Sequence, residues 1–474
     1  MGASQIMDVI VVGLGASGIA AVRRLHDAGL KVLGLEAADR IGGRILTVDY
    51  GACKTDLGAA WCHGEKDNVV FELANQHNLL GKPSGPDNKW FILSNGELVP
   101  QGTGVEIENI LGEELAKADK HNTGSISDCI RNATKTNPTL QKTPTLSASF
   151  AEWFERNNHV GGQIDKKNGK SLRGLIENWP CEGEPMNNWK GRGYQSILDI
   201  LLNKYPDPSK QIDVELLLNK EVNNIRWGTS RVSANDVNPL VQVKCKDGSL
   251  YAAKSVLVTM SVGVLKERHN ELFSPPLPSS KVKAIENLQL CVLDKIYIEF
   301  ERPWWKHPSN FAIIWRDEDK KSFSEDEYWI TEIYALWTVE HQPNLLLAWI
   351  YGEGAKVMET KSVEEVREGV QKLIDRVVKK QFDVTPIKSI LRSSWASNPF
   401  TRGSYSYRSV SSEETGGDAI TLSEPLHRGS NNFPIVCFGG EATSHRRHNA
   451  VHGAVEAGFR EADRLIESIR GLNK

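Results

Sequence analysis

The first 36 residues hold the feature that most constrains the fold. An apolar run, Asp8–Val12, leads directly into Gly13, Gly15 and Gly18, and Glu36 follows later. This order is typical of a buried parallel strand that turns into a helix whose free N–H groups point at a phosphate. The three glycines serve, in order, the tight turn, the approach of backbone to pyrophosphate, and close packing of helix on strand. The pattern predicts a dinucleotide site.

The residues between the glycines and Glu36 support that prediction. Ala20–Ala28 reads as the helix, Gly29 ends it, and Leu30–Leu35 is the second strand, which delivers Glu36 to a ribose hydroxyl. An ordinary glycine-rich loop would explain the glycines but not a strand, a helix, a second strand and an acid in this order.

The segment after Glu36 indicates which dinucleotide binds. Arg40 and Arg44 flank Gly42 and Gly43, where a nicotinamide enzyme would continue into its next helix. Two glycines between two arginines suit a second backbone approach to a diphosphate, with a guanidinium group to neutralise it. A surface turn with solvated arginines is the alternative interpretation. We favour FAD.

The far end of the chain supplies the other half of this predicted site. Pro434–Phe438 reads as a buried strand, followed by Gly439–Thr443 and by a helix with small residues on one face. Those small residues are Gly453, Ala454, Ala457 and Gly458. Helix packing alone could require such a face. With the preceding strand and acid, it favours a helix N-terminus pointed at the pyrophosphate or the flavin ring.

Further motifs complete the set along the chain. They are Asp56–Gly64, Val258–Lys266, Leu293–Phe300, Arg302–Trp305, Trp395, Arg402–Tyr407, Gly439–Thr443 and His452–Ala454. Together with the N-terminal motifs, they resemble the flavin-dependent amine oxidases over nearly the whole chain, and most closely the polyamine oxidase branch with spermine oxidase and N1-acetylpolyamine oxidase.

The resemblance implies an α/β fold with two interleaved domains. A discontinuous, Rossmann-type FAD-binding domain is expected from residues 1–84, 192–290 and 396–474. An α+β substrate-binding domain is expected from residues 85–191 and 291–395. At 474 residues the chain is long enough for two substantial cores.

Lys295, His63 and Tyr405 are the catalytic candidates. From the pattern alone, Lys295 lies on the polar face of the strand Leu293–Phe300, as an exposed lysine would. The resemblance implies instead that it holds a water against flavin N5, that His63 hydrogen-bonds the substrate nitrogen, and that Tyr405 forms an aromatic wall along which the amine reaches the flavin.

The resemblance also assigns the cofactor contacts. Besides Gly13, Gly15, Gly18, Glu36, Arg40, Gly43 and Arg44, they are Ser17, Gly58, Ala59, Trp61, Val222, Trp395, Gly440, Glu441 and Val451. Ser404 stands where monoamine oxidases carry the cysteine that joins the flavin, which implies non-covalent FAD. Ala450 and Val451 differ from the family pattern, in which the second aromatic wall of the amine cage lies just before the position of His452.

A polyamine also needs acidic anchors away from the flavin. Glu177, Glu182 and Glu184 flank the substrate-domain segment that precedes Gly193 and Tyr194. Of these, Glu182 and Glu184 are the candidate anchors, although such glutamates are often only solvated. His445, His448 and His452 are spaced like metal ligands, but Arg446 and Arg447 intervene. No metal is expected.

Two charged or amphipathic segments complete the structural expectations. Arg316–Glu327 is a charged run that reads as a solvated loop. Ser362–Lys380 reads as an amphipathic helix that buries Val363, Val366, Val370, Leu373, Ile374 and Val377.

Composition limits partners and location. A net charge of -3 gives no electrostatic reason to expect nucleic acid or an anionic membrane. Seven scattered cysteines, and only Met1–Met7 before the first strand, suggest a cytoplasmic protein. The charged C-terminal helix is unlike a membrane tail. We expect a monomer or weak dimer whose partners are a polyamine and dioxygen.

The predicted reaction is oxidation of spermine, spermidine or their N1-acetylated forms at the carbon next to a secondary amine, which gives an aldehyde, a shorter amine and hydrogen peroxide. The alternatives are a histone-lysine demethylase-like enzyme, an amino-acid oxidase, and a flavin-binding protein without turnover. A demethylase of this superfamily would carry a long coiled-coil insertion, which this sequence lacks.

Overall fold

The apolar run near the start of the chain forms a central strand of a nine-stranded sheet. In the computed structural model, which describes residues 6–85, 88–118, 123–158, 169–228, 240–416, 418–428 and 432–472, strand β1 (Met7–Val12) pairs in parallel with β2 (Val32–Leu35) and β10 (Leu250–Val258). Helix α1 (Ala16–Asp27) follows the glycine-rich turn. The predicted strand, turn, helix and strand are confirmed.

The rest of this sheet comes from distant parts of the sequence. Its order is β11-β8-β9-β10-β1-β2-β7, and β20 joins it by pairing with β10 and β19. The other strands are β7 (Glu215–Leu217), β8 (Val222–Trp227), β9 (Val241–Cys245), β11 (Phe273–Ser274), β19 (Leu426–Arg428) and β20 (Phe433–Phe438).

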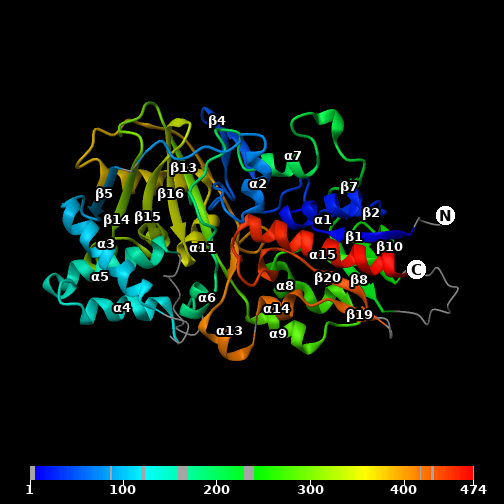
Figure 1. The fold of residues 1–474 in the computed structure, drawn as a ribbon. Coiled ribbons are helices and arrows are strands. Elements are labelled where there is room, and N and C mark those ends of the chain that lie inside the picture. Colours follow the sequence, from blue (N-terminus) through cyan, green and yellow to red (C-terminus); the bar gives the residue numbers. More distant parts are fainter. Residues whose placement is uncertain are drawn as a thin grey trace.

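The two ends of the chain lie side by side in this part of the molecule. Figure 1 shows α1 in blue next to α15 (Val451–Leu472) in red. A Cβ added at Gly458 would lie 2.2 Å from the carbonyl oxygen of Ser17. At this position the small-residue face of the C-terminal helix therefore serves close packing on α1, the simpler of the two predicted reasons for it.

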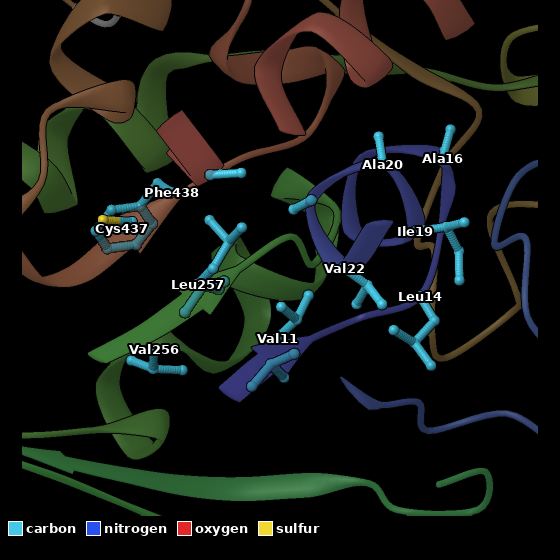
Figure 2. Close-up of a cluster of buried hydrophobic side chains, with 14 of the residues drawn as sticks. Val11, Leu14, Ala16, Ile19, Ala20, Val22, Val256, Leu257, Cys437 and Phe438 are labelled. Carbon is cyan, nitrogen blue, oxygen red and sulfur yellow. The ribbon is translucent and has the colours of Figure 1, made fainter. Parts of the chain in front are cut away.

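An apolar cluster fixes the turn between sheet and helix. Figure 2 shows Val11 of β1, Leu257 of β10, Phe438 of β20 and Ile19 of α1 in this cluster. All four side chains are buried. Burial of such side chains stabilises the fold by roughly 1.5–3 kcal/mol each, so the glycine-rich turn rests on a rigid base.

A separate seven-stranded sheet has the order β17-β13-β16-β15-β14-β5-β6. Its strands are β5 (Asn88–Leu93), β6 (Leu98–Val99), β13 (Leu293–Phe300), β14 (Ser309–Ile314), β15 (Ile333–Val339), β16 (Gln342–Tyr351) and β17 (Ile387–Arg392). The fold is thus mixed α/β, with one sheet that contains parallel strands and a second, mixed sheet.

Strand β13 is buried on both faces. Ile296 and Ile298 belong to one apolar cluster, and Tyr297 belongs to another on the opposite face. Lys295 is only 5% exposed. The alternation of polar and apolar residues along this strand therefore predicted the wrong exposure for Lys295, because other parts of the chain cover the face that carries Lys295 and Tyr297.

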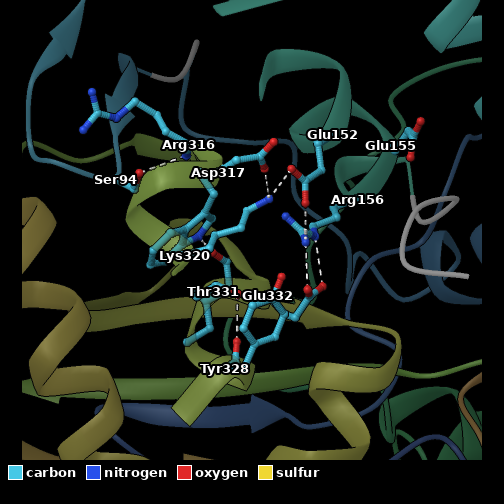
Figure 3. A network of polar contacts seen from close by, with 12 residues as sticks. Ser94, Glu152, Glu155, Arg156, Arg316, Asp317, Lys320, Tyr328, Thr331 and Glu332 are labelled. Carbon is cyan, nitrogen blue, oxygen red and sulfur yellow. Dashed lines mark hydrogen bonds and ion pairs between the residues drawn. The ribbon is translucent and has the colours of Figure 1, made fainter. Parts of the chain in front are cut away.

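The charged run Arg316–Glu327 is largely exposed, as predicted, but it is not simply a loop. Residues Asp317–Lys320 form the short helix α10, in which Asp319 and Lys320 are buried. Lys320 forms ion pairs with Asp317 and with Glu152 of helix α5 (Pro144–Asn157) (Figure 3). The prediction was therefore wrong for these two residues, because charged side chains can be buried when they are paired.

The amphipathic helix is shorter than predicted. Ser362 caps α12 (Val363–Leu373) in a capping box with Glu365, and a π-helical turn covers Ile374–Val378. Val366, Val370, Leu373, Ile374 and Val377 are buried as expected. Val363 is 54% exposed, because it stands at the first position of the helix.

Other helices surround the sheets. They are α2 (Val69–Asn75), α3 (Gln101–Ala116), α4 (Ile126–Thr136), α6 (Leu172–Ile176), α7 (Ser196–Leu201), α8 (Val262–Leu272), α9 (Ser279–Asn287), α11 (Glu353–Glu359), α13 (Val410–Thr415) and α14 (Ala419–Ser423). Two small ladders, β3 (Thr47–Tyr50) with β4 (Cys53–Asp56) and β12 (Gln289–Cys291) with β18 (Tyr405–Tyr407), complete the fold. Within the described residues, none of the helices has the length and apolar character needed to cross a bilayer.

Candidate active site

A cavity of about 460 Å³ is lined by segments from the N-terminal turn, from both large sheets and from the C-terminal region. Most predicted cofactor residues line it: Gly13, Gly15, Ser17, Glu36, Arg40, Gly43, Arg44, Gly58, Ala59, Trp61, Val222, Trp395, Gly440, Glu441 and Val451. Lys295, His63 and Tyr405 line it as well. The structure thus brings the predicted cofactor and catalytic residues to one place.

Gly18 has a different position from the other motif glycines. It does not line the cavity, and a Cβ added there would lie 2.0 Å from the carbonyl oxygen of Gly13. At Gly15 the only neighbour of an added Cβ is the carbonyl oxygen of Gly42, 3.8 Å away. Gly18 therefore tightens the turn, whereas Gly15 leaves open space at the cavity wall.

Glu36 stands at the carboxyl end of β2. Its two carboxylate oxygens accept hydrogen bonds from the N–H groups of Leu14, at 2.7 Å, and Ala38, at 2.9 Å. A carboxylate has about four acceptor positions, so two remain for hydroxyl groups of a ligand. Because Gly15 caps α1 without a side-chain hydrogen bond, the helix N-terminus is also suited to an anion. These features fit a dinucleotide.

The two arginines of the second glycine segment have protein partners. Arg40 donates hydrogen bonds to the carbonyl oxygens of Ile41, Gly43 and Ile45. Arg44 forms a 2.8 Å ion pair with Glu441. Both guanidinium groups hold the cavity wall together, and their contact with a diphosphate stays a prediction.

Lys295 projects from β13 toward the cavity. Its Nζ donates hydrogen bonds to the carbonyl oxygens of Asp56, at 2.9 Å, and Gly58, at 2.6 Å. An ammonium group has three donors, so a third is available for a water or ligand. Burial lowers the pKa of Lys295 to about 8, and the nearby charge of Asp56 opposes this shift.

Three indoles form the wall beside Lys295. The Trp61 ring centroid lies 6.1 Å from that of Trp337 and 6.0 Å from that of Trp349. The Nζ of Lys295 lies 5.4 Å from the Trp61 and Trp349 centroids. Sequence reasoning missed Trp337 and Trp349, although Trp349 lies opposite Lys295 in the strand register.

His63 lies in the cavity wall with a defined tautomer. Its Nδ1 is 2.6 Å from the carbonyl oxygen of Pro185. A carbonyl only accepts, so Nδ1 carries the proton and Nε2 keeps a lone pair. Desolvation lowers the pKa of His63; the hydrogen bond to Pro185 opposes this shift, and the charge of Lys295 adds to it. The imidazole is therefore neutral near pH 7 and can accept a hydrogen bond.

His452 is a second imidazole that lines the cavity and that sequence reasoning did not select. Burial lowers its pKa to about 4, with smaller contributions from Arg447 and His63. Its place at the start of α15, among the small residues, was the available signal.

Tyr405 is at the cavity wall, as predicted, but its ring already faces a cation. The Nζ of Lys170 lies 5.5 Å from the Tyr405 ring centroid. The adjacent Ser404 hydroxyl accepts a hydrogen bond from the N–H of Leu293 and donates one to the carbonyl oxygen of the same residue.

The structure does not bring the predicted acidic anchors into the cavity. Glu182 is exposed and pairs with Lys66 at 3.1 Å, and Glu184 accepts a hydrogen bond from the N–H of Met186. Neither residue lines the cavity. Among the described residues, no group of three or more His, Cys, Asp or Glu side chains is arranged to hold a metal ion.

Comparison with known proteins agrees with this geometry. The family described as flavin containing amine oxidoreductase matches residues 16–466. The chain is 31% identical to the peroxisomal N(1)-acetyl-spermine/spermidine oxidase of Bos taurus and 30% identical to that of Homo sapiens, each over 97% of this chain and 94% of the relative. It is 26% identical to polyamine oxidase 1 of Oryza sativa subsp. japonica, over 98% of both chains.

Proposed function

This chain belongs to the flavin-containing amine oxidoreductase family, and we propose that its substrate is a polyamine, either free or N1-acetylated. The observation that carries the proposal is that one cavity joins a dinucleotide-type turn to Lys295, His63 and three indoles. The polyamine oxidases among the relatives of this chain support the choice of substrate.

The proposed reaction consumes the amine, water and dioxygen and gives an aldehyde, a shorter amine and hydrogen peroxide. When bound, FAD would supply the acceptor for a hydride from the carbon next to the nitrogen and the route for the electrons to dioxygen. Glu36 and the turn at Gly15 would hold its ribose and pyrophosphate. Hydride leaves only from a carbon beside a neutral amine.

The polar residues of the cavity serve this need for a neutral amine. Nε2 of His63 accepts a hydrogen bond from the amine N–H, and the indoles exclude water around it. Lys295 holds a water with its third donor, which is the water that hydrolyses the imine.

We expect His63→Leu to lower kcat/KM for the amine about tenfold, the effect of losing one hydrogen bond of about 1.4 kcal/mol. His63→Gln, which retains an acceptor, should recover part of this loss. Protonation of the amine itself lowers kcat/KM as the pH falls from alkaline values, in the native protein and in the variant alike. Because the pKa of His63 is lowered, the native protein should show a further fall below about pH 6.5, where protonation removes the lone pair. A pH profile identical in His63→Leu would contradict this role.

We also propose that FAD is bound non-covalently, because position 404 carries a serine whose hydroxyl is engaged with Leu293. Acid precipitation of the yellow protein should then release the flavin into the supernatant. Absorbance of the supernatant and the pellet measures this, and flavin retained in the pellet would show a covalent bond.

A peroxide assay with the purified holoprotein tests the function. The panel comprises spermine, spermidine, their N1-acetyl forms, monoamines, amino acids and methylated histone peptides. Peroxide release with one of the four polyamines, at least about tenfold faster than with the other classes, is expected. Activity confined to amino acids or histone peptides, or no turnover of any substrate, would overturn the proposal.

A further inference from the structure

Two carboxyl groups lie in contact behind the cavity wall, although neither lines the cavity. Asp294 precedes Lys295 on β13, and Glu359 is the last residue of α11. Asp294 is 0% exposed and Glu359 is 8% exposed, and their side chains are within hydrogen-bonding distance of each other. The proposed mechanism uses neither of them.

Asp294 holds the loop that follows β17. Its Oδ1 accepts a 2.6 Å hydrogen bond from the hydroxyl of Ser393, two residues before Trp395. Ser393 in turn forms two hydrogen bonds with the backbone of Lys295, through its hydroxyl at 2.9 Å and its N–H at 3.0 Å. One carboxyl group thus connects the strand of Lys295 to the loop of Trp395.

Glu359 holds the next part of the same loop. Its two oxygens accept hydrogen bonds from the N–H groups of Ala396, at 2.8 Å, and Ser397, at 2.6 Å. Glu359 therefore accepts from two consecutive backbone N–H groups, at residues 396 and 397. Trp395 lines the cavity, and the pair holds the residues on both sides of it, Ser393 through Asp294 and Ala396 and Ser397 through Glu359.

The charges of the pair need compensation. Two buried carboxylates in contact cannot both be ionised without a large cost. Within the part of the chain that the structure describes, no lysine or arginine forms an ion pair with Asp294 or Glu359. The nearby Arg392 donates instead to the carbonyl oxygens of Glu359 and Lys361 and to the hydroxyl of Ser394.

A proton on Asp294 would reduce the negative charge of the pair and would give Oδ2 of Asp294 a hydrogen-bonding partner. Oδ2 of Asp294 is buried and accepts no hydrogen bond from the described residues, whereas both oxygens of Glu359 already accept one. Burial, and then the adjacent Glu359, raise the pKa of Asp294 well above its usual value. An O–H at Oδ2 would donate to Glu359 and leave only one negative charge, on the residue that faces two N–H groups.

We infer that Asp294 is protonated at Oδ2 and donates to ionised Glu359, and that this proton-bridged pair positions Trp395 and the Lys295 strand at the cavity wall. Asp294 and Glu359 are positioning residues, since neither lines the cavity that would hold cofactor and substrate.

Infrared spectroscopy of the holoprotein tests for the proton directly. At about pH 8 ordinary carboxyl groups are ionised, as is Asp56, whose pKa is raised only to about 6. The native protein should still show the carbonyl stretching band of a protonated carboxylic acid, and Asp294→Asn should lose it. Glu461→Gln, which alters a buried carboxylate paired with Arg460 and Arg464, should keep the band.

The two amide substitutions should also differ in their effect on the cavity. Asparagine at 294 can donate to Glu359 and accept from Ser393, so Asp294→Asn should change FAD affinity by less than about twofold. Glutamine at 359 places an NH2 group against the N–H of Ala396 or Ser397. Glu359→Gln should therefore weaken FAD binding about tenfold or more, as measured by fluorescence titration.

Either of two results would overturn the inference: an acid band that persists unchanged in Asp294→Asn, or a loss of FAD affinity in Asp294→Asn as large as in Glu359→Gln. Because Asp294→Asn is expected to fold, the infrared measurement decides the question even when Glu359→Gln does not accumulate. Both readouts are independent of the amine, so they are unaffected by a failure of the proposed substrate.

Discussion

Gly15→Ala should purify as a folded, colourless protein. A methyl group at this position meets only the carbonyl oxygen of Gly42, at 3.8 Å, so the turn can accept it without rearrangement. It would, however, point into the cavity where a pyrophosphate has to touch the backbone. We expect the affinity for FAD to fall at least about 100-fold, or about 2.7 kcal/mol, while the Tm of the apoprotein stays within about 3 °C of the native value.

Gly18→Ala is the matched control, with the opposite outcome. The same methyl group would lie 2.0 Å from the carbonyl oxygen of Gly13, a backbone atom that can move only if the turn changes shape. We expect a loss of about 1–3 kcal/mol in the free energy of unfolding of the apoprotein, visible as a lower Tm without any ligand.

Fluorescence titration with FAD and thermal unfolding of the two apoproteins measure these effects. Retention of full FAD affinity in Gly15→Ala would show that the cofactor does not touch this glycine. An apoprotein of Gly18→Ala with native Tm would show that the turn is not tightly packed. The pair thus separates the contribution of the motif to binding from its contribution to folding.

Sequence reasoning worked best where the signal was local. The strand, turn, helix and second strand that end at Glu36 depend on neighbours in sequence, and the structure reproduces them. Lys295, His63 and Tyr405 were selected through the family resemblance, and all three line the cavity. The pattern itself placed Lys295 on an exposed face, because alternation along a strand does not reveal what covers each side.

The missed residues depend on contacts between distant segments. Trp349 lies opposite Lys295 only because β13 pairs with β16 in one register, and Trp337 joins it from β15. The burial of Lys320 depends on Glu152, which is far away in sequence. Glu182 was selected for its charge alone, and the structure pairs it with Lys66 outside the cavity. Charge and periodicity do not encode these pairings.

Lys295→Met should slow flavin reduction, or the reaction of reduced flavin with dioxygen, by at least about tenfold, which corresponds to about 1.4 kcal/mol of activation free energy. The substitution keeps the volume of the side chain but removes the donor that would hold a water at the cavity wall. Stopped-flow spectroscopy of the two half-reactions, normalised to bound flavin, measures the effect. Unchanged traces for both half-reactions would contradict the assigned role.

Lys281→Met provides a closely matched control. Lys281 is also buried, its pKa is also lowered by burial to about 8, and it also donates to backbone carbonyl oxygens, those of Thr421, Leu422 and Glu424. It does not line the cavity. Lys281→Met should therefore lower the Tm without changing either rate per bound flavin, which distinguishes a general effect of removing a buried ammonium from an effect at the site.

The pH dependence gives a second test of Lys295. Its lowered pKa means that the folded protein loses this proton near pH 8, whereas an unfolded lysine keeps it to about pH 10.4. A positive charge favours electron transfer to dioxygen, so the rate of that half-reaction should fall as the pH rises through about 8 in the native protein. In Lys295→Met this inflection should be absent, while Lys281→Met should retain it, because only one of the two ammonium groups lies where the chemistry takes place.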